Sequence, residues 1–156
     1  LASAPIGKRQ LCAVMIDLDH FKRINDCFGH DMGDRVIQAF ADILRSTAPK
    51  SAHLARTGGE EFVILLNRVT APAAGLIVEA IRAHTREHGH ADLPTFSFSA
   101  GISQYQAGDS LADLMRRADQ ACYRAKTLGR DRIETDHGIA ADSTASTVVP
   151  FKAVNA

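Results

Sequence analysis

Hydrophobic residues recur along the chain with two spacings, one typical of strands and one typical of helices. Residues 11–16 form a continuous apolar run that ends at two acids, Asp17 and Asp19, and predict a buried strand. The stripe from Val36 to Leu44 repeats every three or four residues and predicts a helix laid on a sheet. The full pattern predicts strands over 11–16, 53–57, 60–66 and 95–103, helices over 21–28, 36–48, 72–88 and 111–128, and a short extended piece over 132–134.

Three of these segments carry specific expectations. The strict alternation over 95–103 predicts a strand with one buried and one exposed face. Gly58 and Gly59 join two strands into a hairpin, where a positive φ is available at little steric cost. The helix over 72–88 is expected to face the core with Leu76, Ile77, Ala80 and Ile81.

The order of the elements favours an α/β fold, in which a central mixed sheet is flanked by helices. The 156 residues suffice for one domain with a single core, which we expect to span residues 11–137. Residues 1–10 are then an N-terminal remnant or linker. Residues 138–156 carry only Asp142 and Lys152 as charges and are expected to form a poorly ordered tail.

The charge balance excludes some function classes. Lys and Arg number 18, as do Asp and Glu, so no overall field attracts nucleic acid and no nucleic-acid partner is expected. No apolar stretch approaches the roughly 20 residues that span a bilayer, so we expect a soluble, cytoplasmic domain. Cys12, Cys27 and Cys122 lack metal-site spacing and are expected to be reduced thiols in the core.

The segment Gly58-Gly59-Glu60-Glu61-Phe62 places two adjacent acids between a sharp turn and an apolar strand. Asp17 and Asp19 end the first strand, which can lie beside this hairpin, so three or four carboxylates are expected to converge. Carboxylate oxygens suit Mg²⁺, which completes its octahedron with waters and substrate phosphates. Taken by itself, the hairpin segment is better interpreted as a turn with solvated acids.

The residues after the first strand indicate a nucleotide site. A helix N-terminus with free N–H groups, followed by Lys22, favours phosphate. A carboxylate at Asp34 accepts hydrogen bonds from N1–H and the exocyclic amine of guanine, which adenine does not offer together. Taken alone, Asn25 and Asp34 are better explained as turn and cap residues around Gly29 to Gly33.

Lys126 and Arg130 lie four residues apart at the end of the last helix. Cations at this position compensate the helix dipole. They also suit the charge on the terminal phosphates of a nucleoside triphosphate. The two roles are compatible.

Together these segments resemble the GGDEF domain, the catalytic module of bacterial diguanylate cyclases. The resemblance covers roughly residues 11–134, with the blocks in the family's order. The matching blocks are Asp17 to Lys22, Ile24 to Asp26, Gly29-His30, Gly33-Asp34, Gly58 to Phe62, Ala118-Asp119, Tyr123, Ala125-Lys126 and Gly129-Arg130. The resemblance implies a largely antiparallel sheet flanked by helices, akin to polymerase palms and class III nucleotide cyclases.

The resemblance also implies a role for each matching residue. Asp17 and Glu60 would bind Mg²⁺ through their carboxylates and Leu18 through its carbonyl. Lys22 would stabilise charge on the transferring phosphoryl group, and Glu60 and Glu61 would help to deprotonate the attacking hydroxyl. The implied nucleotide contacts are Phe21, Asn25, His30 and Asp34, with Asn25 and Asp34 on guanine, and Lys126 and Arg130 on the terminal phosphates.

The implied reaction joins two GTP molecules into cyclic di-GMP and releases two pyrophosphates, with two Mg²⁺ ions for each GTP and Mn²⁺ as a substitute. Because one domain holds one GTP, activity requires a homodimer. A catalytically silent GTP-binding regulatory domain is the alternative, and a cyclic di-GMP receptor is the least favoured function.

Two segments depart from the family's pattern. The Arg-x-x-Asp inhibitory site, where many members bind the product, is replaced by Pro49-Lys50-Ser51-Ala52, so weak or absent product inhibition is expected. Residues 1–10 do not supply the family's usual N-terminal segment. This favours a fragment of a larger sensor protein whose N-terminal sensor domain is missing from the chain.

Overall fold

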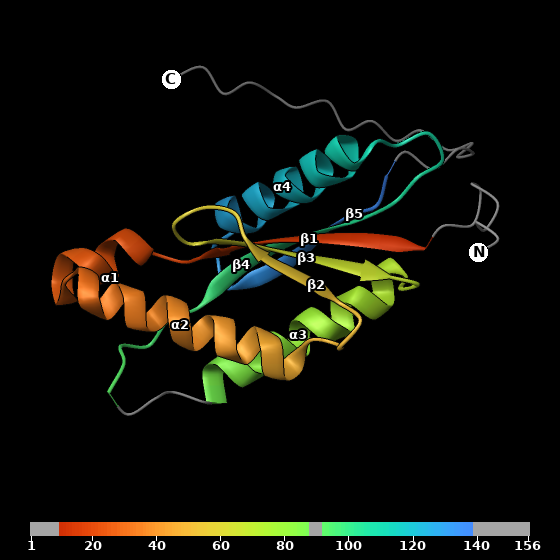
Figure 1. Ribbon diagram of the computed structural model, residues 1–156. Helices are drawn as coiled ribbons and strands as arrows, with labels where there is room; N and C mark the ends of the chain where they lie inside the picture. Colours follow the sequence, from red (N-terminus) through yellow and green to blue (C-terminus); the bar gives the residue numbers. More distant parts are fainter. Residues whose placement is uncertain (1–9, 88–91, 139–156) are drawn as a thin grey trace, which may run out of the picture.

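The computed structural model describes residues 10–87 and 92–138, which contain five strands and four helices (Figure 1). In chain order they are β1 Leu11–Leu18, α1 Phe21–Phe28, α2 His30–Thr47, β2 His53–Arg56, β3 Glu61–Asn67, α3 Ala71–Glu87, β4 Phe98–Gln104, α4 Leu111–Thr127 and β5 Arg132–Asp136. Every predicted element is present. The expected remnant and tail lie outside the described residues, apart from Gln10 and Gly138.

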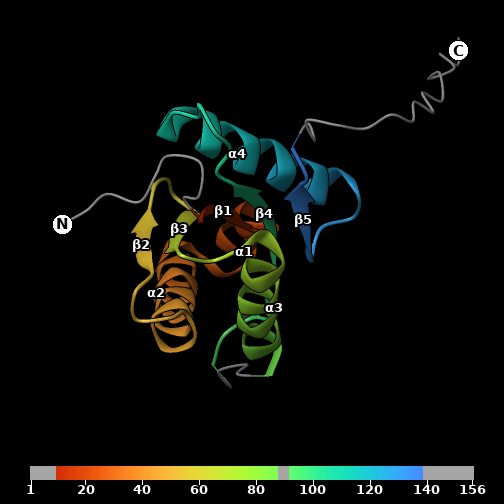
Figure 2. The same ribbon diagram turned by 90° about the vertical axis from the view of Figure 1, so that its right-hand side faces the viewer.

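The strands form one sheet in the order β2-β3-β1-β4-β5. All neighbours are antiparallel except β4 and β5, which are parallel. Helices α2 and α3 cover one face and α4 covers the other (Figures 1 and 2). The prediction of a mixed, largely antiparallel sheet flanked by helices is confirmed, with β1 at its centre.

An aromatic cluster joins α2 to the sheet. The ring of Phe40 lies 5.1 Å from that of Phe62 and 5.2 Å from that of Phe98, between centroids, and 6.3 Å from that of Phe96. Phe40 and Phe98 are fully buried. Edge-to-face contacts of this kind add to the free energy gained by burial, so the cluster fixes α2 against β3 and β4.

Strand β4 is buried on both faces, so the expectation of one exposed face is wrong. Its polar positions lie under α4, where the Ser103 hydroxyl donates to the Leu114 carbonyl oxygen at 2.7 Å. Gly101 allows this close approach, because a Cβ there would lie 2.1 Å from the Ala118 carbonyl oxygen and the Cys122 amide nitrogen. The polar positions that alternate along this segment are therefore small or hydrogen-bonded residues covered by α4, and they do not form a solvent-exposed face.

The inner face of α3 matches the prediction only in part. Ile81 is buried and Ile77 packs against the core as expected, whereas Leu76 is 76% exposed and Ala80 is exposed too. The buried residues are Ala74, Val78, Ile81 and Thr85. In an Ala-rich helix the apolar positions define several overlapping stripes, and contact with the sheet selects one of them.

Two of the three cysteines lie in the core as predicted, but Cys27 is exposed on α1. Burial raises the pKa of the Cys12 thiol to about 11 and that of Cys122 to about 12, so both stay protonated. Among the described residues, no helix is both long and apolar enough to cross a membrane.

Candidate active site

Three segments meet at one end of the sheet: the end of β1, the loop between β2 and β3, and the end of α4 (Figure 1). The Leu18 amide donates to the Glu60 carbonyl oxygen at 3.1 Å, and Asp17 lies opposite Glu61 in the register of β1 and β3. Sheet pairing therefore brings the acids of the two predicted motifs side by side.

A hollow of about 200 Å³ lies at this end of the sheet. It is lined by Asp17, Leu18, Asp19, His20, Phe21, Lys22, Glu60, Lys126 and Arg130. The structure thus gathers most of the predicted metal, catalytic and phosphate-binding residues around one space. The predicted nucleotide contacts Asn25, His30 and Asp34 do not line this hollow, and neither does the predicted catalytic residue Glu61.

Lys126 pairs with Asp17 inside the site. Its Nζ donates to Asp17 Oδ2 at 2.7 Å, and the two side chains are 32% and 13% exposed. Burial alone lowers the pKa of Lys126, but the hydrogen bond and charge of Asp17 outweigh it and hold the pKa above its usual value. The ammonium group therefore remains charged and compensates the partly buried carboxylate.

Asp17, Asp19 and Glu60 all line the hollow, so three carboxylate residues come together there as expected, but Asp19 is engaged in hydrogen bonds and is not placed to share a metal ion with the other two. Its Oδ1 accepts from the Ser99 hydroxyl at 2.6 Å, and its Oδ2 accepts from the Ser97 hydroxyl at 2.7 Å and the Asp131 amide at 3.0 Å. Over the described part of the chain, no group of three or more His, Cys, Asp and Glu residues is placed to hold a metal ion. Asp19 is a structural residue that ties β1 to β4 and to the start of β5.

The remaining donors still fit Mg²⁺. Asp17 and Glu60 supply carboxylates at the hollow, and the backbone of Leu18 lies between them. Mg²⁺ in nucleotide sites typically takes one or two carboxylates and fills its other positions with waters and phosphates. Two acids beside an open hollow match that need.

The loop between β2 and β3 consists of Thr57, Gly58, Gly59 and Glu60, and its Thr57 amide donates to the Glu61 carbonyl oxygen at 2.9 Å. Neither glycine has a positive φ, so the expected conformational reason for glycine is wrong. A Cβ at Gly58 would lie 2.8 Å from Glu61 Oε2, at the end of an exposed side chain that can move aside, so the contact alone does not require glycine.

Arg56 is a site residue that the sequence did not reveal. Its Nε donates to the carbonyl oxygens of Gly58 and Gly59, at 3.1 and 3.0 Å. These bonds fix the loop that presents Glu60. Its only signal in the sequence is its position two residues before the diglycine.

The start of α1 faces the hollow without a side-chain cap. His20 precedes the helix in a left-handed conformation with φ 53° and makes no capping hydrogen bond. The Lys22 side chain is 91% exposed and lies 3.8 Å from Asp26. Uncapped N–H groups beside an exposed ammonium group suit a phosphate.

Asn25 lies in a cradle formed by the following helix. Its Oδ1 is buried and has no hydrogen-bond partner among the described residues. A Cβ on Gly33 would lie 1.8 Å from this oxygen. Only Gly29 separates α1 from α2, so Asn25 lies in α1 and Asp34 in α2, and their interpretation as turn and cap residues is wrong.

His30 and Asp34 lie four residues apart on the exposed first turns of α2. Residues at this spacing share one face of a helix. This polar face therefore lies next to the buried Asn25 carboxamide. A hydrogen-bond donor on the edge of a base would supply the partner that Asn25 Oδ1 lacks.

Gly33→Ala is expected to weaken guanine nucleotide binding by about tenfold or more, because the new methyl group displaces the Asn25 carboxamide. Isothermal titration with GMP measures the effect. Gly75→Ala on α3 is the matched control, since a Cβ there meets nothing within 4 Å. Unchanged GMP affinity in Gly33→Ala would contradict the assignment of Asn25.

Comparisons with known proteins agree with this architecture. The family model described as "Diguanylate cyclase, GGDEF domain" matches residues 2–132. Diguanylate cyclase DgcM of Escherichia coli is 42% identical over 120 residues, which cover 77% of this chain and 29% of that protein. Response regulator PleD of Caulobacter vibrioides is 38% identical over 137 residues, which cover 83% of this chain and 30% of that protein.

Solved structures give the same result. The active GGEEF domain of a diguanylate cyclase from Vibrio cholerae matches with a TM-score of 0.77 and 39% identity, covering 81% of this chain and 83% of that one. The chain spans 29%, 19% and 40% of the lengths of three curated relatives, from Escherichia coli, Pseudomonas aeruginosa and Vibrio cholerae. With a family model over most of its length, the chain belongs to the GGDEF family of diguanylate cyclase domains.

Proposed function

We propose that this chain is the catalytic domain of a diguanylate cyclase, which condenses two GTP molecules into cyclic di-GMP and releases two pyrophosphates. The observation that carries the proposal is the hollow at the end of β1. There Asp17 and Glu60 lie beside the uncapped start of α1 and the cations Lys126 and Arg130.

The metal-binding residues would be Asp17, Glu60 and the Leu18 carbonyl. Mg²⁺ bound there supplies charge stabilisation at the phosphates and favours the ionised form of the attacking hydroxyl. Glu60, with Glu61, accepts the proton of the 3′-hydroxyl that attacks the α-phosphate of the other GTP. Little covalent chemistry by the protein is needed, because positioning and electrostatics supply most of the catalysis of phosphoryl transfer.

The cations would hold the triphosphate. Lys22 stabilises the charge that develops on the transferring phosphoryl group, and Phe21 contacts the nucleotide. Lys126 and Arg130 bind the terminal phosphates. Lys126 pairs with Asp17 in the structure. In the proposed complex its ammonium group would bind a phosphate oxygen and Asp17 would bind the metal ion, so both groups would keep a partner of opposite charge.

Two copies of the domain must cooperate. Each hollow accommodates one triphosphate, and each 3′-hydroxyl must reach the α-phosphate of the other GTP. A homodimer with two facing sites satisfies this need. An N-terminal sensor domain outside this chain would control the pairing, and GTP as substrate implies a cytoplasmic location for the domain.

Guanine selection would rest on Asp34 and Asn25. Asp34→Ser is expected to relax base selectivity by about tenfold or more, since one carboxylate accepts two guanine donors. Competition between GTP and ATP for the protein measures the effect. Asp31→Ser, in the first turn of the same helix, is the control. A variant that rejects ATP as strictly as the wild type would exclude Asp34 from base selection.

Product inhibition through the usual surface is expected to be weak or absent. Residues 49–52 form a turn in which the Ala52 amide donates to the Pro49 carbonyl oxygen at 2.9 Å. Neither Pro49 nor Ala52 offers a guanidinium or carboxylate to a guanine base.

The experiment that tests the proposed function identifies the product. The purified domain is incubated at high concentration with GTP and Mg²⁺, and separately with GTP and ATP, and products are identified by mass. We expect cyclic di-GMP in both incubations and no product that contains adenine. GTP binding without turnover, also in a fusion to a dimeric coiled coil, would favour the silent regulatory domain.

A further inference from the structure

The turn between α4 and β5 has an unusual backbone. Three successive residues have positive φ angles: Gly129 at 122°, Arg130 at 62° and Asp131 at 46°. Residues other than glycine rarely adopt this conformation and keep it only when surrounding contacts hold them there. The proposed function places the middle residue, Arg130, on the terminal phosphates of GTP, so the contacts that hold the turn bear on the site.

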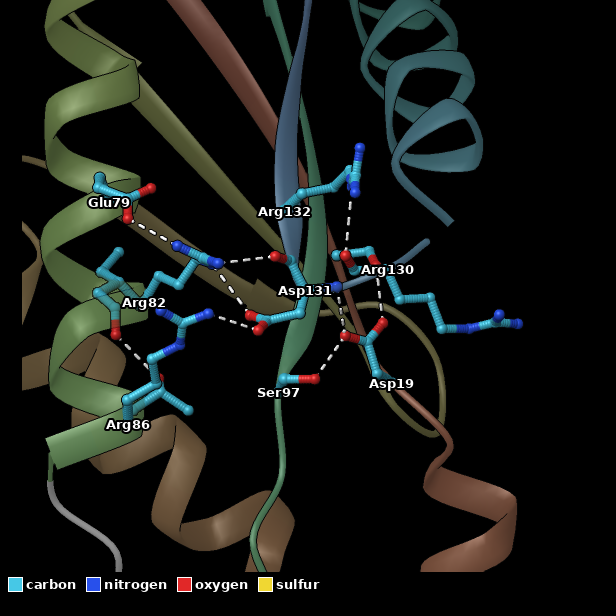
Figure 3. A network of polar contacts seen from close by, with 11 residues as sticks. Asp19, Glu79, Arg82, Arg86, Ser97, Arg130, Asp131 and Arg132 are labelled. Carbon is cyan, nitrogen blue, oxygen red and sulfur yellow. Dashed lines mark hydrogen bonds and ion pairs between the residues drawn. The ribbon is translucent and has the colours of Figure 1, made fainter. Parts of the chain in front are cut away.

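Helix α3 holds Asp131 from one side (Figure 3). Arg82 Nη2 donates to the Asp131 carbonyl oxygen at 2.8 Å, and its Nε donates to Asp131 Oδ1 at 3.0 Å. Arg86 reaches Asp131 Oδ2 at 2.5 Å, and Glu79 orients Arg82 through a 2.8 Å bond. The Arg82 side chain is only 18% exposed, so water competes little with the hydrogen bonds that its planar guanidinium donates to the backbone and the carboxylate of Asp131.

Strands β1 and β4 hold the same residue from the other side. The Asp131 amide donates to Asp19 Oδ2 at 3.0 Å, and the Asp19 carboxylate is fixed in turn by the hydroxyls of Ser97 and Ser99. Asp19 follows Leu18 directly, so this anchor starts at the proposed metal site. Arg132 Nε also donates to the Arg130 carbonyl oxygen at 3.3 Å.

We propose that Arg82 and Asp131 are positioning residues that orient Arg130 toward the terminal phosphates of GTP, an inference that rests on the proposed function. In Figure 3 the Arg130 side chain leaves the network on the side away from Arg82. The bonds of the network therefore fix the backbone of Arg130 and do not involve its guanidinium group. Without Arg82, the Asp131 carbonyl and carboxylate lose their shared donor, the turn relaxes toward negative φ, and the Arg130 side chain leaves the hollow.

The test compares the binding of two ligands that differ in the number of phosphates, because a loss of positioning affects only the ligand with terminal phosphates, whereas a general loss of stability affects both. The ligands are 3′-deoxyGTP, which lacks the attacking hydroxyl and cannot react, and GMP, which lacks the terminal phosphates. Titrations with Mg²⁺ compare the wild type, Arg82→Ala, Arg130→Ala and the double variant. We expect Arg82→Ala to lower the affinity for 3′-deoxyGTP about tenfold and to leave the affinity for GMP within about twofold of the wild type. The double variant should bind 3′-deoxyGTP no more weakly than Arg130→Ala.

Arg45→Ala is the control, because its exposed pair with Asp42 lies on α2, away from the turn. The inference would be overturned if Arg82→Ala lowered the affinity for both ligands equally, or if the losses of 3′-deoxyGTP affinity in the two single variants added up in the double variant.

Amide hydrogen exchange over residues 129–132, measured without nucleotide, tests the turn itself. Faster exchange in Arg82→Ala is expected, and unchanged exchange would overturn the inference as well. Failure of the wild type to bind 3′-deoxyGTP, with faster exchange in the variant, would contradict the proposed function and with it the role toward phosphate.

Discussion

Glu60→Gln is expected to reduce cyclic di-GMP formation by about a thousandfold or more, because the variant loses both roles proposed for this carboxylate, metal ligand and proton acceptor. The fold should survive, since the interaction that places residue 60 beside β1 uses its carbonyl oxygen, which accepts from the Leu18 amide. Initial rates of product formation, followed by chromatography, measure the effect.

The matched control is Glu134→Gln on β5, which removes a carboxylate outside the site. Its rate should stay within about twofold of the wild type, and thermal midpoints of both variants should stay within about 4 °C. Comparable rates for Glu60→Gln and the wild type would remove Glu60 from the mechanism.

Gly101→Ala is expected to destabilise the fold by about 3 kcal/mol or more, or to prevent folding. The added Cβ would lie 2.1 Å from two backbone atoms of α4, which cannot rotate away as a side chain does. Helix α4 also carries Lys126, so any shift that relieves the clash moves the partner of Asp17. Denaturation with urea measures the loss of stability.

Gly75→Ala again provides the comparison, because the same methyl group meets open space on α3. Its stability should equal or exceed that of the wild type by up to about 1 kcal/mol, since alanine favours the helix. A loss of less than about 1 kcal/mol in Gly101→Ala would contradict the close packing of α4 on β4.

The helices and strands could be predicted where the hydrophobic pattern agreed with residues that end or cap an element. The apolar run of β1 ends at acids, Gly29 separates α1 from α2, and Ser110 caps α4 with Asp113 in a reciprocal pair of hydrogen bonds. Burial was harder to predict. The exposed Leu76 and the buried serines of β4 depend on which helix covers which face, and that is decided by contacts between distant segments.

The candidate site shows the same division. The acids and cations were identified because they stand in short motifs whose spacing carries the chemistry. The role of Asp19 was not, because its partners Ser99 and Asp131 lie 80 and 112 residues away in sequence. Arg82, 49 residues from Asp131, gave no local signal either. Residues that hold a site in place are visible only once the chain is folded.

The dependence of the rate on protein concentration distinguishes the proposed homodimeric cyclase, in which each copy supplies one GTP, from a domain that acts alone. Initial rates of cyclic di-GMP formation are measured at saturating GTP and Mg²⁺ over a wide range of protein concentration. We expect the rate to rise with about the second power of concentration while monomers dominate. For a fusion to a dimeric coiled coil we expect a linear rise. A strictly linear rise from a domain that sedimentation shows to be monomeric throughout would contradict the dimeric mechanism.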